Sequence, residues 1–257
     1  MALFDDVFNA KLIYEMLFFN VKAVLIYPTL IDLEHRNKPL YDRWQQLRTT
    51  KYFRVVMSPD ELYQEYAPNF SEYTRIVAIT YATLYSENGT LKRFFKKIAN
   101  EDEHIVLATF MDVLYGLSSE GTKSVPNYFP ILCGHNIISY DIPLLIKRFL
   151  VLKDKFEGTK QLPFMLKRCL NIKPWESGVI DIINVWKFNG FENISLMLIA
   201  DYLGLKKTVD LLPLEGLSKY YWENVYNNPA ETLEYISLQS ATQTNLVIQL
   251  MNELRQL

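Results

Sequence analysis

The chain has 257 residues, of which 49% are hydrophobic and 14% aromatic, and its formal net charge is −2. This is enough apolar material for one buried core, and we expect a single domain over residues 1–257. The charge balance argues against a strongly basic nucleic-acid-binding protein, and no run of 18 apolar residues predicts a membrane span. With two cysteines and no signal-peptide pattern at the N-terminus, we expect an intracellular, cytoplasmic protein without a membrane partner.

The first half of the chain predicts a buried strand followed by a hairpin. Residues 12–27 are rich in aromatic and β-branched side chains, as is typical of a buried strand. A second strand is predicted at 74–85. The Asn88-Gly89 pair then gives the best short signal for a hairpin, so the strand within 91–97 should be its antiparallel neighbour.

The second half alternates helices with short strands. Its expected helices cover 101–117, 141–152, 195–205 and 229–254, and its expected strands cover 128–134 and, in extended form, 179–188. The whole order predicts an α/β fold. We expect a mixed sheet, made of an antiparallel hairpin plus parallel strands, with helices on both faces.

The stretch GHNIISYDIP lies where a predicted strand meets a predicted helix. It places His135 and Asn136 before Asp141 and Pro143, and Arg148 follows in the helix. An Asp before a Pro in the first helical turn is good chemistry for a helix cap. A carboxylate at a strand-to-helix junction also suits a metal ligand, and one residue can fill both roles.

This motif and the order of the elements resemble the DEDD 3′–5′ exonucleases, which have an RNase H-like fold. More closely, the chain is similar to stand-alone proteins related to the proofreading exonuclease domain of family B DNA polymerases. The resemblance extends roughly from residue 14 to residue 254. Supporting motifs are KPWE at 173–176, WKF at 186–188 and EGLSKYYW at 215–222.

The resemblance implies a site with two Mg²⁺ or Mn²⁺ ions held by four carboxylates. Two of these carboxylates belong on the first strand, where this chain has Asn20 and Lys22. The third is Asp141, which is present. In the DEDDy subgroup the fourth follows a Tyr by four residues on the last helix, where this chain has Tyr235 and Gln239. One carboxylate of four is kept, and Tyr235 is a vestigial catalytic residue.

These replacements predict the loss of metal binding and of hydrolysis. A Lys ammonium about 4 Å from Mg²⁺ would repel it by roughly 8 kcal/mol at an effective dielectric of about 20. Neutral amides such as those of Asn20 and Gln239 are poor substitutes for anionic oxygen ligands. We therefore expect no cofactor, and a Lys22–Asp141 pair in place of the metals.

An alternative keeps the chain an active metal-dependent 3′–5′ exonuclease with a rewired site. The stretch LIDLEHR, within a helix-containing excursion at 30–51, has its own Asp-x-Glu pair in Asp32 and Glu34. If this run were the first strand, Asp32, Glu34 and Asp141 could hold metal. Asp181 is a further acidic candidate, but a strand-end Asp bonded to backbone is the expected role there.

A local basic stretch indicates how nucleic acid could still bind. Residues 147–173 hold eight basic side chains against two acidic ones, a local charge of +6, so the rest of the chain carries −8. The candidate binding residues near the path of a strand are His135, Asn136, Tyr140 and Arg148. The expected partner is single-stranded DNA or a 3′ end, and a purely protein partner stays open.

Overall fold

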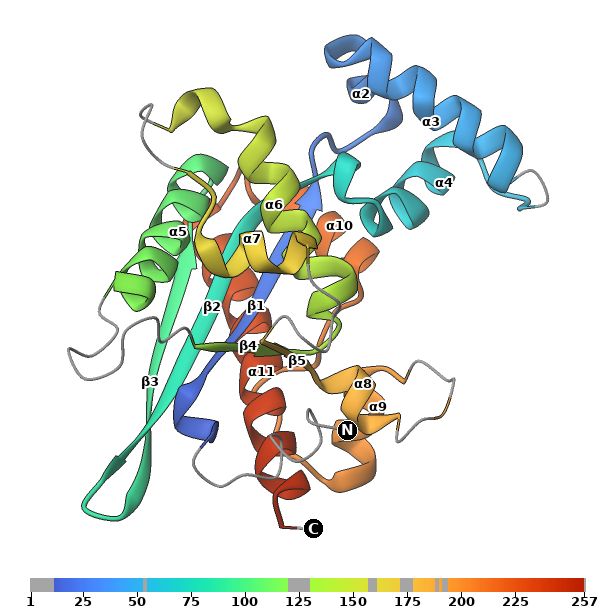
Figure 1. The fold of residues 1–257 in the computed structure, drawn as a ribbon. Helices are drawn as coiled ribbons and strands as arrows, with labels where there is room; N and C mark the ends of the chain where they lie inside the picture. Colours follow the sequence, from blue (N-terminus) through green and yellow to red (C-terminus); the bar gives the residue numbers. More distant parts are fainter. Residues whose placement is uncertain are drawn as a thin grey trace.

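The protein is described by a computed structural model in which residues 12–52, 55–119, 130–156, 161–171, 178–187, 190 and 194–256 are placed (Figure 1). Five strands form one sheet in the order β3-β2-β1-β4-β5. Their bounds are Met16–Leu25 (β1), Thr74–Glu87 (β2), Thr90–Ala99 (β3), Ile131–Gly134 (β4) and Val179–Asp181 (β5). β2 is antiparallel to β1 and β3, whereas β4 is parallel to β1 and β5 to β4. This is the predicted RNase H-like mixed sheet.

The central strand and the hairpin follow from their sequences. All ten residues of β1 are buried, because helices cover both faces of the sheet at its centre. The β2–β3 turn is made by Asn88 and Gly89, which have φ values of 53° and 76°. Both values lie in the left-handed region that a two-residue hairpin turn requires, so the predicted hairpin is confirmed.

Helices form a layer on each face of the sheet (Figure 1). One face packs against α5, α6 and α7, and the other against α8, α9 and α11. Their bounds are Glu103–Ser119 (α5), Ile142–Val151 (α6), Phe164–Asn171 (α7), Ile182–Trp186 (α8), Leu196–Leu203 (α9), Leu214–Asn224 (α10) and Pro229–Leu254 (α11). Among the residues the structure places, no helix combines the length and apolarity needed to cross a membrane.

Three helices between β1 and β2 form a separate aromatic cluster. They are Leu30–Arg36 (α2), Lys38–Lys51 (α3) and Pro59–Tyr66 (α4), and Figure 1 shows them projecting beyond the end of β1. Trp44 is fully buried at the centre of this cluster and makes edge contacts with Tyr63 and Tyr73. The excursion predicted at 30–51 is therefore a helical lobe attached to the end of β1.

The segment 179–188 differs from the prediction of an extended strand. β5 ends at Asp181, and α8 begins at the next residue. The Asp181 side chain caps this helix by accepting a hydrogen bond from the Ile183 N–H. A capping Asp turns the chain from strand into helix, which the apolar periodicity alone did not reveal.

Candidate functional site

A cavity of about 640 Å³ lies beside β1 at the end of β4. β1 contributes Asn20 and Lys22 to its lining, and the segment after β4 contributes His135, Asn136 and Asp141. With Tyr140, which also lines the cavity, the fold brings together six of the residues singled out in the sequence. α11 adds a side chain that the sequence analysis missed, Gln243.

A π-helical turn positions Asp141. The turn, Ile137–Asp141, follows Asn136, whose φ of 63° is left-handed, and runs directly into α6. From the neighbouring strand, Asp181 accepts hydrogen bonds from the N–H groups of Asn136 (2.7 Å) and Ile138 (3.0 Å). The backbone-bonded role predicted for Asp181 is confirmed, and this carboxylate fixes the turn that carries Asp141. Turns of this kind are often found at functional sites.

Gly134 lets this turn close against β1. A Cβ atom at position 134 would lie 2.4 Å from Cγ2 of Ile137 and 2.8 Å from the carbonyl oxygen of Phe19. Both distances are far below van der Waals contact, and one of them is to backbone. A side chain here would push the turn away from the central strand, and Asp141 with it.

Asp141 faces β1 and does not cap α6. Its Oδ1 accepts a hydrogen bond from the Val21 N–H (2.6 Å) and a longer one from Nδ2 of Asn20 (3.4 Å). It makes no side-chain cap bond, and its backbone is helical, with φ −63° and ψ −47°. The predicted cap is wrong because the π-helical turn continues into α6, so Asp141 lacks the extended backbone of a capping residue.

Lys22 lies in the same cavity but does not bond Asp141 directly. Its Nζ donates to Oε1 of Gln243 at 2.6 Å. Within the placed residues no Lys22–Asp141 ion pair of 4.0 Å or less occurs, so the predicted direct pair is wrong. The β1–β2 register shifts between Lys22 and Ala23, an irregularity of the type often found next to active sites.

Burial shifts the pKa values of both charged groups. It raises the pKa of Asp141 to about 7, although the Val21 N–H and Lys22 both favour the carboxylate. It lowers the pKa of Lys22 to about 8, although the field of Asp141 favours the ammonium. The two groups therefore interact through space, and burial moves the pKa of each toward neutral pH.

The last helix presents Gln243, not Gln239, to Lys22. Gln239 accepts from the Leu212 N–H (2.9 Å) and donates to the Tyr235 hydroxyl (3.0 Å), so it ties α11 to the segment before α10. The ring of Tyr235 packs on Tyr220 at 4.3 Å. Gln239 therefore bonds within the fold, and Gln243 is the α11 side chain that reaches Lys22; the interpretation of Gln239 as the replacement of a metal ligand stays a prediction. Gln243 lies four residues after Gln239 on the same helix. This spacing, which puts the two side chains on one face, was the only sequence signal that pointed to Gln243.

Arg148 is buried in a pair with Glu103 and does not line the cavity, so the structure gives no support to its predicted role in nucleic-acid binding. Its Nε donates to Oε1 of Glu103 at 2.8 Å and its Nη2 to Oε2 at 2.5 Å, and both side chains are buried. Glu103 also accepts from the Ile76 N–H at 2.7 Å. This network joins α6, α5 and β2, because a buried guanidinium needs a carboxylate of matching shape.

The other candidate binding residues lie at the cavity and are partly held by the backbone. His135 Nε2 is 3.3 Å from the Ile194 carbonyl oxygen, and burial lowers the pKa of His135. The Tyr140 hydroxyl donates to the Pro68 carbonyl at 3.3 Å, and burial raises its pKa. In the basic stretch, Lys147 pairs with Glu72. The KPWE motif, Lys160, Lys173 and Phe188 lie outside the described residues.

The rewired set does not form. Asp32 and Glu34 stand on α2, which is a helix and not the first strand. Asp32 accepts a hydrogen bond from the Thr29 hydroxyl at 2.5 Å, and Glu34 pairs with Lys38 at 3.0 Å. Neither lines the cavity that holds Asp141. The interpretation of Asp32, Glu34 and Asp141 as one metal site is therefore wrong.

The side chains in the cavity do not fit a two-metal centre. Of the described residues lining it, Asp141 alone is a carboxylate, and its Oδ1 is bonded to backbone. Lys22 and Asn20 stand at two positions where the family resemblance implies anionic ligands, and the amide of Gln243 lies beside them, bonded to Lys22. Divalent cations such as Mg²⁺ prefer anionic oxygen, so these residues oppose binding.

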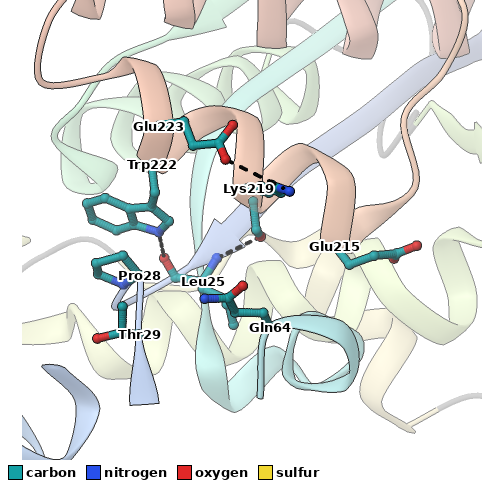
Figure 2. Close-up of a pocket in the computed structure, with 9 residues that line it drawn as sticks. Leu25, Pro28, Thr29, Gln64, Glu215, Lys219, Trp222 and Glu223 are labelled. Carbon is teal, nitrogen blue, oxygen red and sulfur yellow. Dashed lines mark hydrogen bonds and ion pairs between the residues drawn. The ribbon is translucent and has the colours of Figure 1, made fainter. Parts of the chain in front are cut away.

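A second, smaller cavity of about 220 Å³ lies where β1 meets α10 and α4 (Figure 2). Trp222 Nε1 donates to the Leu25 carbonyl, and the Leu25 N–H donates to Oγ of Ser218, both at 3.0 Å. On the exposed side Lys219 approaches Glu223 at 4.0 Å. These bonds give the EGLSKYYW motif a structural role, which is to attach α10 to the end of the central strand.

The chain has no significant match to a protein-family model or to a curated protein. The resemblance to the DEDD exonucleases therefore rests on the residues quoted above. The sheet order and the position of Asp141 beside β1 are compatible with it.

Proposed function

We propose that this chain is a pseudo-exonuclease, a non-hydrolytic relative of the DEDD 3′–5′ exonucleases that binds single-stranded nucleic acid at a 3′ end. The RNase H-like sheet supports the relationship. The main supporting observation is that Asp141 accepts a hydrogen bond from the N–H of Val21, which lies on β1 between Asn20 and Lys22. In an active relative the carboxylates of the first strand would be expected there. The cavity keeps the place of the site but not its metal ligands.

The loss of hydrolysis is tested by digestion of a 5′-labelled single-stranded oligonucleotide with Mn²⁺ at high protein concentration. Asp141→Ala, run on the same gel, is the control for a contaminating nuclease. We expect the oligonucleotide to remain intact with both proteins. A ladder from the 3′ end that Asp141→Ala abolishes would show an active metal enzyme and refute the proposal.

Retention of binding is tested by fluorescence anisotropy with a labelled single strand over a range of salt concentrations. Electrostatic contacts to phosphates make affinity fall as salt rises. We expect salt-dependent binding that a single-stranded competitor displaces and a blunt duplex displaces poorly. Absence of binding at low salt would favour a role through protein contacts alone.

A further inference from the structure

Two polar groups at the cavity, the Lys22 ammonium and the Asn20 side-chain oxygen, make fewer hydrogen bonds than they can. An ammonium has three N–H donors, and Gln243 supplies the one acceptor that the described residues bring within reach of Lys22 Nζ. Asn20 is 4% exposed, and its Oδ1 is a buried acceptor without a hydrogen-bond partner. Buried polar atoms are nearly always bonded, so an orphan acceptor beside a cavity points to a missing donor.

The remaining groups around the cavity leave Lys22 as its principal cation. Asp141 is turned toward the Val21 N–H, and its charge is countered by Lys22 across the site. His135 and Tyr140 are the other titratable side chains that line the cavity, and the nearby Asp181 carboxylate also acts on Asp141. Asn136, Ser139 and Gln243 are neutral. A ligand that completes the hydrogen bonds of the site would bring acceptors to the Lys22 ammonium and a hydroxyl or amino donor to Asn20.

We infer that the cavity binds a phosphate ester with a neighbouring hydroxyl group and that it does so without a divalent cation. The Lys22 ammonium takes over the electrostatic role of the metals by donating to phosphate oxygens, and the hydroxyl donates to Asn20 Oδ1. This inference deepens the proposed function and rests on it for the source of the ligand, the 3′-terminal nucleotide of a strand. A free nucleoside monophosphate offers the same chemistry.

The first arm of the test measures oligonucleotide affinity in EDTA and in Mg²⁺, for the intact protein and for Lys22→Gln. We expect affinities within about twofold in the two buffers, and a loss of about tenfold or more for Lys22→Gln, the size of one charge-assisted hydrogen bond. Lys92→Gln, at an exposed position on the edge strand β3, is the matched control and should bind like the intact protein.

A second variant keeps the test sharp should Lys22→Gln fold poorly. Gln243→Glu is nearly isosteric and places a carboxylate against Lys22, where it competes with the phosphate. We expect it to weaken binding in EDTA as Lys22→Gln does. Thermal melts of all variants verify folding. Undiminished affinity of folded Gln243→Glu would contradict the role of Lys22.

The hydroxyl is tested with an oligonucleotide whose terminal sugar lacks the 3′-OH. The intact protein should bind it about fivefold more weakly, and Asn20→Ala should bind both oligonucleotides equally, since the acceptor is gone. Equal binding of both by the intact protein would overturn the part assigned to Asn20.

The outcomes separate this inference from the proposed function. Oligonucleotide binding that requires Mg²⁺, or that Lys22→Gln leaves unchanged, would overturn the inference and leave the proposed function standing. Lys22-dependent binding of a nucleoside monophosphate without binding of the oligonucleotide would support the ligand chemistry and refute the proposed function. Binding of neither ligand, in EDTA or in Mg²⁺, would overturn both.

Discussion

Among the described residues, two pairs of buried charges are built in opposite ways. Arg148 and Glu103 bond each other twice, and the Ile76 N–H satisfies Glu103 further. Lys22 and Asp141 are as deeply buried, yet each bonds a different group, Gln243 in one case and the Val21 N–H in the other. We call the first pair closed, because its two members bond each other. The second pair is open, because it borders a cavity and the Lys22 ammonium has N–H groups without a bonded acceptor among the described residues.

This difference shows how burial of charge can serve either the fold or a ligand. The Arg148–Glu103 pair has few hydrogen-bonding positions free for a ligand. Its bonds instead hold α5, α6 and β2 together. An open pair pays the desolvation cost without full compensation, as the shifted pKa values of Lys22 and Asp141 indicate. Such sites are typical of binding and catalysis.

The largest effect should come from breaking the closed pair. Arg148→Met leaves Glu103 buried without its cation and should lower the free energy of unfolding by about 3–5 kcal/mol. Urea denaturation measures it. The double variant Arg148→Met, Glu103→Met should be more stable than Arg148→Met alone. A loss below about 1 kcal/mol for Arg148→Met would show that Arg148 and Glu103 do not depend on each other for their burial.

The second effect is a pH dependence that belongs to the open pair. Folding raises the pKa of Asp141 from 3.8 to about 7, so its contribution to stability is present below pH 4 and lost as the pH rises through 7. The stability of the intact protein relative to Asp141→Asn should fall by about 4 kcal/mol over this range. Urea denaturation at several pH values measures this difference, and a constant difference would refute it.

Removing the buried ammonium should have a smaller effect of opposite sign. The pKa of Lys22 is lowered from 10.5 to about 8, so the penalty on the charged form is full at pH 7 and disappears above about pH 10.5. Lys22→Met should raise the free energy of unfolding at pH 7 by about 1 kcal/mol. Lys92→Met is the control. A loss of stability as large as that of Arg148→Met would erase the contrast between the two pairs.

The smallest effect is expected at an exposed pair. Lys147 and Glu72 lie 2.7 Å apart, but their side chains are 47% and 51% exposed. Lys147→Ala should change the free energy of unfolding by less than about 0.5 kcal/mol, because water screens such pairs. Equilibrium unfolding in urea measures this change. A loss above about 1 kcal/mol would mean that the short distance between the two charges matters more for stability than their exposure to water.

The fold was predictable where local signals agreed. The apolar run of β1, the Asn88-Gly89 turn and the pattern of Pro229–Leu254 each predicted an element that the structure contains. β5 was predicted too long, because Asp181 ends the strand by capping a helix. Periodicity finds elements, but it does not find the side chain that ends one of them.

The site was only partly predictable, because its partners are far apart in the sequence. Asn20, Lys22 and Asp141 were correctly placed near one another. No local signal links Lys22 to Gln243, 221 residues away, or Arg148 to Glu103, 45 residues away. The charge pattern of 147–173 predicted a basic surface, yet two of its members, Lys147 and Arg148, are bound to acids.

Gly134 has a consequence for the history of this fold. Its requirement is steric, since any Cβ would collide with Ile137 and with the backbone of Phe19, and it is independent of what the cavity binds. Polar side chains that line the cavity meet no such steric limit, whereas a larger residue at position 134 would displace the turn. If the proposed relationship holds, we expect divergent relatives to keep the glycine that ends the fourth strand where metal ligands vary, which makes it the better landmark for recognising them.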